Sequence, residues 1–251
     1  MQLRNLFLSA LAIGLCIVSC TKDKEDNFAL TSYKDYLPMQ AGDVQLYRMD
    51  STVPTAFGVQ LVVKNYLAKD SVTLQTLDAT GDTVFFVDRF VTDTLQSQPW
   101  TLATTYQIVY TKNTVDLIQA DGKRFIKLTT PVRNGYAWDG NQYFVNQNGQ
   151  NISTDDPAYP YVLWNYVYDS VGLPYQTKYA SYTDAAIVQE VNNISPFNPN
   201  AYSYARFSQE VYANGVGLIE QNILYYNYQP PTSVGAGYDL SSFGIKLTRL
   251  Q

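Results

Sequence analysis

Cys20 is the residue with the best-defined chemistry in this sequence. It follows the tripeptide Ile-Val-Ser at 17–19, which fits the lipobox pattern: an aliphatic residue, a small or β-branched residue, a small residue and then cysteine. Arg4 and the apolar run 6–19 precede it, as in a cleaved targeting peptide. The run is shorter than the ~20 residues of a membrane-spanning helix. We therefore expect cleavage before Cys20 and lipidation of its thiol.

Two absences exclude several classes of chemistry. The other cysteine, Cys16, leaves with the signal peptide, and the chain contains no histidine. The mature protein therefore has no disulfide or thiolate nucleophile, and Ser-His-Asp catalysis, Cys-His catalysis and histidine metal sites are excluded. Oxygen ligands occur at 155–156 and at Asp139 and Asn141, but neither set follows the calcium-loop pattern. We expect no metal and no cofactor.

Carboxylates are the remaining candidates for acid-base chemistry. A glycosidase uses two of them, one on each side of the scissile bond. Glu190 and Glu210 lie in strand-like contexts, and Asp139 lies near an aromatic-rich turn. No spacing rule selects a pair, and all three are also explained as solvent-facing strand residues. We therefore assign no catalytic residue and keep a carboxylate-dependent glycan hydrolase as the alternative function.

Tyrosine is abundant, with 22 residues that cluster at 159–168 and 225–228. Aromatic rings stack on sugar rings, so these clusters are candidates for a glycan-binding surface. Tyrosine is also favoured in strands for its own sake, with the ring on the sheet and the hydroxyl in water. Glycan binding and ordinary strand packing both remain open.

Five triplets combine an aspartate, a serine or threonine, and then an aliphatic residue or threonine. With 18 aspartates, only about one or two such triplets would arise by chance. The pattern resembles the O-glycosylation acceptor of exported Bacteroidetes proteins, but turn aspartates before β-branched strand starts would produce it too. We place the three serines at turn-to-strand junctions and expect them to be modified first. The candidate acceptors are Ser51, Ser71, Thr83, Thr94 and Ser170.

Composition favours a folded domain that does not bind nucleic acid. Without Arg4, the mature chain has 16 basic and 22 acidic side chains, a net charge of −6, which provides no electrostatic footprint for nucleic acid or for an anionic membrane surface. Hydrophobic residues make up 46% and aromatic residues 14% of the chain, enough for a packed core. We assign 1–19 to the signal peptide, 20–32 to a lipidated tether and 33–251 to one all-β domain.

Alternation of apolar and polar residues with period two predicts strands from residue 33 onward. It is clear at 57–63 and recurs at 72–74. The run 84–91 is apolar on both sides, which is typical of a central strand. Segment 201–212 fits either a helix or a hairpin arm, and we favour a strand. The other expected strands are 106–111, 115–119, 123–129, 161–168, 185–191 and 238–250.

Asx-Gly pairs between these segments are typical of tight hairpins, whose type I′ turns require positive φ. Longer loops are expected at 148–160, 194–200 and 229–237. Strands without long helical segments between them predict an antiparallel all-β fold. We expect a single, strongly curved sheet that forms a half-barrel or barrel, with a β-sandwich as the alternative. The Asx-Gly pairs lie at 121–122, 134–135, 139–140, 148–149 and 214–215.

Several segments together resemble a family of Bacteroidetes outer-membrane lipoproteins. Segment 35–43 (Asp-Tyr-Leu-Pro-Met-Gln-Ala-Gly-Asp) resembles the Tyr-x-Pro-Leu…Gly opening of that family, although Gln45 stands where its tryptophan usually lies. Segments 138–141 (Trp-Asp-Gly-Asn) and 210–218 (Glu-Val-Tyr-Ala-Asn-Gly-Val-Gly-Leu) resemble later motifs. The resemblance spans most of the mature chain through short motifs. It implies the fold and the location, and the family carries no activity to transfer.

The acidic tether at 21–26, next to Cys20, resembles the export signal that sends such lipoproteins to the outer leaflet of the outer membrane. A periplasmic location is the alternative. We expect a lipid-anchored outer-membrane lipoprotein, exposed on the cell surface, that serves as a non-enzymatic binding or structural module. Its expected partners are the membrane, through the N-terminal lipid anchor, and a glycan, a lipid or a surface protein.

Overall fold

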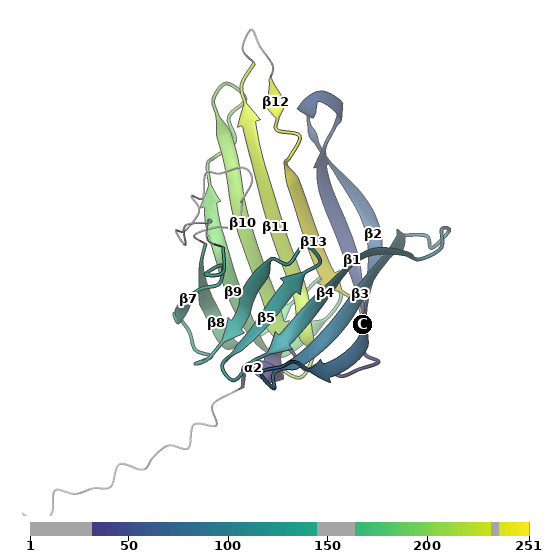
Figure 1. Ribbon diagram of the computed structural model, residues 1–251. Helices are drawn as coiled ribbons and strands as arrows, with labels where there is room; N and C mark the ends of the chain where they lie inside the picture. The colour runs from purple at the N-terminus through teal and green to yellow at the C-terminus, as the bar shows by residue number, and fades with distance from the viewer. Residues whose placement is uncertain (1–31, 145–163, 232–235, 251) are drawn as a thin grey trace, which may run out of the picture. The chain divides into compact units, whose positions relative to one another are not determined.

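The computed structural model describes residues 32–144, 164–231 and 236–250. Contacts divide the chain into Met1–Leu30 and Thr31–Gln251, and every described residue belongs to the second part. This part is almost entirely β-structure, and its one antiparallel sheet is nearly closed into a barrel (Figure 1). The prediction of a single, strongly curved antiparallel sheet is confirmed, and the β-sandwich alternative is wrong.

Within the described residues, thirteen strands form the sheet. Twelve follow one another in the order β6-β5-β4-β3-β2-β1-β13-β11-β10-β9-β8-β7, and β12 pairs with β11. Most neighbours in this order are also consecutive in the chain, so most connections are hairpins. The strands are β1 (Val44–Pro54), β2 (Leu61–Leu77), β3 (Thr83–Asp93), β4 (Thr101–Tyr110), β5 (Thr114–Gln119), β6 (Arg124–Thr129), β7 (Ala137–Asp139), β8 (Asn165–Gln176), β9 (Ser181–Ile194), β10 (Ser203–Ala213), β11 (Gly217–Gln229), β12 (Gly237–Tyr238) and β13 (Phe243–Arg249).

The two ends of the sheet, β6 and β7, meet at a seam that has no β-ladder between the described strands. The Ile126 N–H donates to the Gly140 carbonyl (2.8 Å), and the Trp138 indole N–H donates to the Ile126 carbonyl (2.9 Å). A Cβ atom on Gly140 would lie 2.5 Å from the Tyr166 ring, so glycine permits this close approach. Individual hydrogen bonds therefore hold the barrel together where strand pairing stops.

Two predicted strands differ from those observed. The strand expected at 57–63 begins only at Leu61, because Ala56–Gly58 forms a 3-10 turn (η1) at the tip of the β1–β2 hairpin. Phe57 is 90% exposed there, so the alternation at this tip did not reflect burial. The strand expected at 238–250 is divided by a turn in which the Asp239 carbonyl accepts from the Ser242 N–H (2.9 Å). The ambiguous segment 201–212 is strand β10, as predicted.

A short helix, α2 (Tyr33–Tyr36), lies at one end of the barrel (Figure 1). The side chain of Ser32 caps it by accepting a hydrogen bond from the Lys34 N–H, which satisfies one of the free donors of a helix start. Tyr33 and Tyr36 are buried in the main hydrophobic core. None of the helices in the described ranges has the length and apolar character that a membrane crossing requires.

The Asx-Gly pairs serve different geometries. The pairs ending in Gly122 and Gly215 form the β5–β6 and β10–β11 hairpin turns, with φ of 84° and 71°, as predicted. The pair at 134–135 lies between β6 and β7, which do not pair with each other. Gly140 directly follows β7 at the seam, without positive φ, so the hairpin expected there is wrong. The pair at 148–149 lies outside the described residues.

Candidate functional site

The inside of the barrel holds a cavity of about 480 Å³, a volume typical of small-molecule sites. Strands β1 to β6, β10, β11 and β13 line it. Leu37 and Met39 also line it, and they follow α2, which lies at one end of the barrel (Figure 1). Much of the wall is apolar, so the cavity can bury the apolar body of a small molecule. The main apolar wall residues are Ile108, Leu117, Leu218, Ile223, Phe243 and Ile245.

One row of polar side chains crosses four strands of the cavity wall. Gln45 pairs with Asp70, Asp70 pairs with Arg89, and Arg89 pairs with Thr104. Directly paired residues of neighbouring strands place their side chains on the same face of a sheet. All four residues therefore face the cavity, although they come from β1, β2, β3 and β4.

Arg89 and Asp70 form the first charged cluster of the cavity. Arg89 Nε and Nη2 donate to the two carboxylate oxygens of Asp70, each at 2.6 Å, and the Tyr106 hydroxyl donates to Asp70 at 2.9 Å. Burial alone would lower the pKa of Arg89, but the Asp70 carboxylate outweighs burial and raises that pKa. Burial, reinforced by Asp70, raises the pKa of Tyr106. Arg89 and Asp70 therefore form a bidentate ion pair whose opposite charges cancel.

Lys127 of β6 reaches across the interior to two glutamates on other strands. Its ammonium group donates to Glu190 of β9 and lies 2.8 Å from Oε1 of Glu210 of β10. Glu190 and Glu210 are only 2% and 1% exposed. The hydroxyls of Ser208 and Tyr212 donate to Glu190 and Glu210, respectively. Buried charges persist when they are paired and hydrogen-bonded in this way.

In this second cluster the carboxyl group of Glu190 takes up a proton near neutral pH. Burial raises the pKa of Glu190 to about 7; the charge of Glu210 acts in the same direction, and Lys127 opposes both. Burial works to lower the pKa of Lys127, but the two glutamates outweigh it and raise that pKa. Below about pH 7 Glu190 is therefore a neutral carboxylic acid beside the Lys127 ammonium group.

The two glutamates considered for glycan hydrolysis are thus brought together, but on a single lysine. Glu210 lines the cavity, whereas Glu190 does not. Asp139 lies apart on β7, where its carboxylate accepts a hydrogen bond from the Asn141 N–H (3.0 Å). Hydrolysis requires two carboxylates that reach the same scissile bond. The cavity offers one carboxylate of the pair, and Lys127 already neutralises it.

Sequence reasoning did not single out Arg89, Asp70 or Lys127 as site residues. A signal was nevertheless present, because Arg89 and Lys127 interrupt strongly apolar strands. Charged side chains are rarely buried unless they are paired. A charge in such a strand therefore indicates a partner on another strand, although only the register identifies that partner.

The tyrosine clusters do not form one continuous surface among the described residues. Tyr166 and Tyr168 of the first cluster are fully buried, and part of that cluster lies outside the described residues. The second cluster divides between the two faces of β11. Tyr225 stacks on Phe243 of the cavity wall (ring centroids 5.7 Å apart), and Tyr226, on the opposite face, packs against Tyr238 (5.5 Å).

The five candidate O-glycosylation sites lie at different places from those expected. Ser51, Ser71 and Ser170 lie inside β1, β2 and β8, not at turn-to-strand junctions, so that expectation is wrong. Thr83 is the first residue of β3, and Thr94 directly follows its end. All five residues are partly buried.

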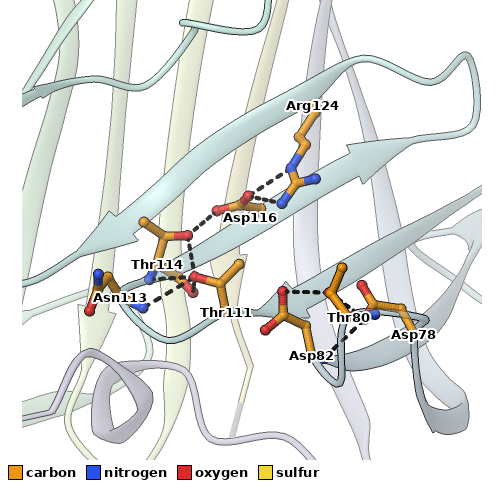
Figure 2. A network of polar contacts seen from close by, with 8 residues as sticks. All are labelled: Asp78, Thr80, Asp82, Thr111, Asn113, Thr114, Asp116 and Arg124. Carbon is orange, nitrogen blue, oxygen red and sulfur yellow. Dashed lines mark hydrogen bonds and ion pairs between the residues drawn. The ribbon is translucent and has the colours of Figure 1, made fainter.

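Two separate groups of polar contacts lie in the turns near α2 (Figure 2). Figure 2 shows Asp116, which is fully buried, accepting from Arg124 Nε (2.7 Å) and from the Thr114 hydroxyl (2.6 Å). In the β2–β3 turn, the Thr80 hydroxyl donates to the aspartates on either side of it. Among the described residues, no three His, Cys, Asp or Glu side chains are grouped to hold a metal ion. These carboxylates accept hydrogen bonds that stabilise the turns.

No protein-family model matches this chain, and no curated protein matches it. The function must therefore be argued from the site and from the sequence signals. Cys20 and the acidic tether lie outside the described residues, so lipidation stays a prediction.

Proposed function

We propose that this chain is a lipid-anchored outer-membrane lipoprotein that binds a small, partly apolar molecule inside its barrel, as a binding module rather than a catalyst. The cavity is the observation that carries the proposal. Its wall is largely apolar, and its main charged groups are already paired with one another. Burial of apolar ligand surface would therefore supply most of the binding free energy.

The competing proposal, a carboxylate-dependent glycan hydrolase, has weaker support. It would need Glu190 and Glu210 to act on one substrate, yet only Glu210 lines the cavity. Both carboxylates would also have to break hydrogen bonds to Lys127 before acting as acid, base or nucleophile. Breaking such a buried pair is strongly unfavourable.

The membrane assignment rests on the lipobox at Cys20 and on the tether that follows it. Eleven residues separate Cys20 from Ser32, where the described domain begins. The acidic residues at 21–26 support display on the cell surface.

Equilibrium dialysis tests the binding function. The mature lipidated protein would be held in phospholipid nanodiscs, with empty nanodiscs as the blank, and dialysed against radiolabelled 1-octanol and octanoate. Thr104 lines the cavity and is exposed, so Thr104→Trp should place a large ring in the ligand's path without disturbing the core. Binding of the preferred ligand should fall by about tenfold or more, the change expected when about 1.4 kcal/mol of contact is lost.

Thr76→Trp is the matched control, because Thr76 is an exposed position on β2 that does not line the cavity. This variant should bind both ligands as the wild type does. The proposal is wrong if neither ligand binds above the blank, or if Thr104→Trp and Thr76→Trp bind equally well.

A further inference from the structure

Arg206 lies on the cavity side of β10, next to the cavity wall. It pairs with Tyr225 of β11, which in turn pairs with Phe243 of β13, and Phe243 lines the cavity. The guanidinium carbon of Arg206 lies 3.8 Å from the centre of the Tyr225 ring. Since paired residues share a face of the sheet, these three side chains form one row that extends the cavity wall.

The guanidinium group of Arg206 is fixed in place but not fully used. Nη1 donates to the carbonyls of Ala205 (2.9 Å) and Tyr226 (2.8 Å), and Nη2 donates to the Asn227 side chain (2.8 Å). A guanidinium carries five N–H donors, so Nε–H and one Nη2–H have no acceptor among the described residues. The Arg206 side chain is only partly buried.

Arg206 differs in its ion pairing from Arg89 and Lys127, the two cations that line the cavity. Arg89 is paired with Asp70, and Lys127 with two glutamates. Arg206 has no carboxylate at ion-pair distance within the described residues. The two cations of the cavity wall therefore have carboxylate partners, whereas Arg206 carries a positive charge without one. A partly buried cation in a fixed position favours an oxyanion with free lone pairs.

Apolar side chains connect Arg206 to the cavity. Ile223 and Ile245 pair with each other one step along the strands from Tyr225 and Phe243, and both line the cavity. From Arg206 to Glu210 the strand covers four residues, roughly 13 Å. That length is comparable with a medium-length alkyl chain. The wall thus has Arg206 at one end, apolar side chains along its length, and the paired charges of Glu210 and Lys127 at the other end.

We propose that the ligand of the barrel is an amphiphile with an acidic head group, which binds Arg206 while the apolar body occupies the cavity. The acidic head group would accept hydrogen bonds from the two free N–H groups of the guanidinium, and its negative charge would pair with Arg206. This proposal rests on the binding function proposed above and names the class of its ligand.

The same dialysis of nanodisc-held protein against octanoate and 1-octanol tests the ligand class, because the two probes share a chain length and differ in the charge of the head. The wild type should bind octanoate at least about tenfold more tightly than 1-octanol, as expected for charge-assisted hydrogen bonds. Arg206→Gln should remove that preference, because it weakens octanoate binding far more than 1-octanol binding. Retained 1-octanol binding also shows that the variant is folded.

Arg48→Gln is the matched control, because Arg48 is paired with Asp50 and does not line the cavity. It should keep the preference for octanoate. Equal binding of the two probes by the wild type, or an octanoate preference that survives Arg206→Gln, would overturn the role of Arg206 and leave binding inside the barrel intact. If neither probe binds, the proposed function fails first, and the ligand class fails with it.

Discussion

The hydroxyl of Tyr168 takes the place of a neighbouring strand for Thr129. It donates to the Thr129 carbonyl (2.7 Å) and accepts from the Thr129 N–H (2.9 Å). Thr129 ends β6 at the seam, and Tyr168 lies fully buried on β8. Burial raises the pKa of Tyr168, so the hydroxyl keeps the proton that it donates. One phenol therefore satisfies both main-chain groups of an edge residue that would otherwise lack partners.

We expect Tyr168→Phe to destabilise the barrel by about 1–3 kcal/mol, because it leaves two buried main-chain groups of Thr129 unsatisfied. Urea unfolding would measure the loss, and amide exchange should accelerate at Thr129. Tyr182→Phe is the control, because no described residue hydrogen-bonds the Tyr182 hydroxyl; a change within about 0.5 kcal/mol is expected there. Equal stability of the two variants would show that the seam does not depend on Tyr168.

Cys20→Ser should leave the precursor uncleaved and without lipid, since a thioether to lipid requires the thiol. Metabolic labelling with a radioactive fatty acid, followed by a mobility assay, would measure both effects. Cys16→Ser is the control, because Cys16 lies within the signal peptide and should be removed with it. Normal lipid incorporation in Cys20→Ser would contradict the lipoprotein assignment.

The positions of the five triplets now rank the predicted O-glycosylation sites. Ser51 pairs with Ile245, whose side chain lines the cavity, so a glycan at Ser51 would have to lie inside the barrel. Thr94 lies in the turn after β3, where Asp93 accepts from the Leu95 N–H (3.1 Å). In intact-mass measurements of natively expressed protein, Thr94→Ala should lower the measured mass by more than the CH2O that the substitution itself removes, because the glycan is lost as well. Ser51→Ala should not.

A native mass that exceeds the sequence mass only by the lipid would reduce the triplets to turn and strand chemistry. A glycan lost on Ser51→Ala would contradict the ranking. The hydrogen bond that Asp93 accepts shows that at least this aspartate has a structural task of its own, whether or not Thr94 is modified.

Local patterns predicted the strands well and the closure of the barrel only in outline. Alternation placed β5 at 115–119, and the structure begins it at Thr114. The strand predicted at Phe57 was wrong because alternation of apolar residues does not show whether they are buried, and Phe57 is exposed. The seam depends on contacts such as that between Trp138 and Ile126. No local periodicity reports such contacts, because they join residues from different hairpins.

The charged site was less predictable for a related reason. Glu190 and Glu210 were noticed as carboxylates, but their partner Lys127 lies 63 residues before Glu190. A bulge shifts the register between β9 and β10, so residue pairing cannot be counted from strand spacing. The sequence therefore shows which charges are unusual, and the fold shows which of them meet.

The buried position of Glu190 predicts an unusual dependence of stability on pH. Its pKa in the folded protein is raised from 4.5 to about 7, so between these values the folded state binds more protons than the unfolded state. The contribution of this residue to stability is therefore complete below about pH 4.5 and is lost as the pH rises to about 7. At about 1.4 kcal/mol per pH unit, the loss is roughly 3 kcal/mol at most.

Glu190→Gln should remove this loss, because glutamine stays neutral and can still hydrogen-bond to Lys127 and Ser208. Urea unfolding of both proteins at several pH values from 5 to 8 should show the wild type losing stability relative to the variant as the pH rises. Glu220→Gln is the control: Glu220 pairs with Lys246 at 3.6 Å on the opposite face of β11, and this variant should follow the wild-type curve. Parallel curves for the wild type and Glu190→Gln would mean that Lys127 keeps Glu190 ionised over this pH range. That result would contradict the uptake of a proton by Glu190 near neutral pH.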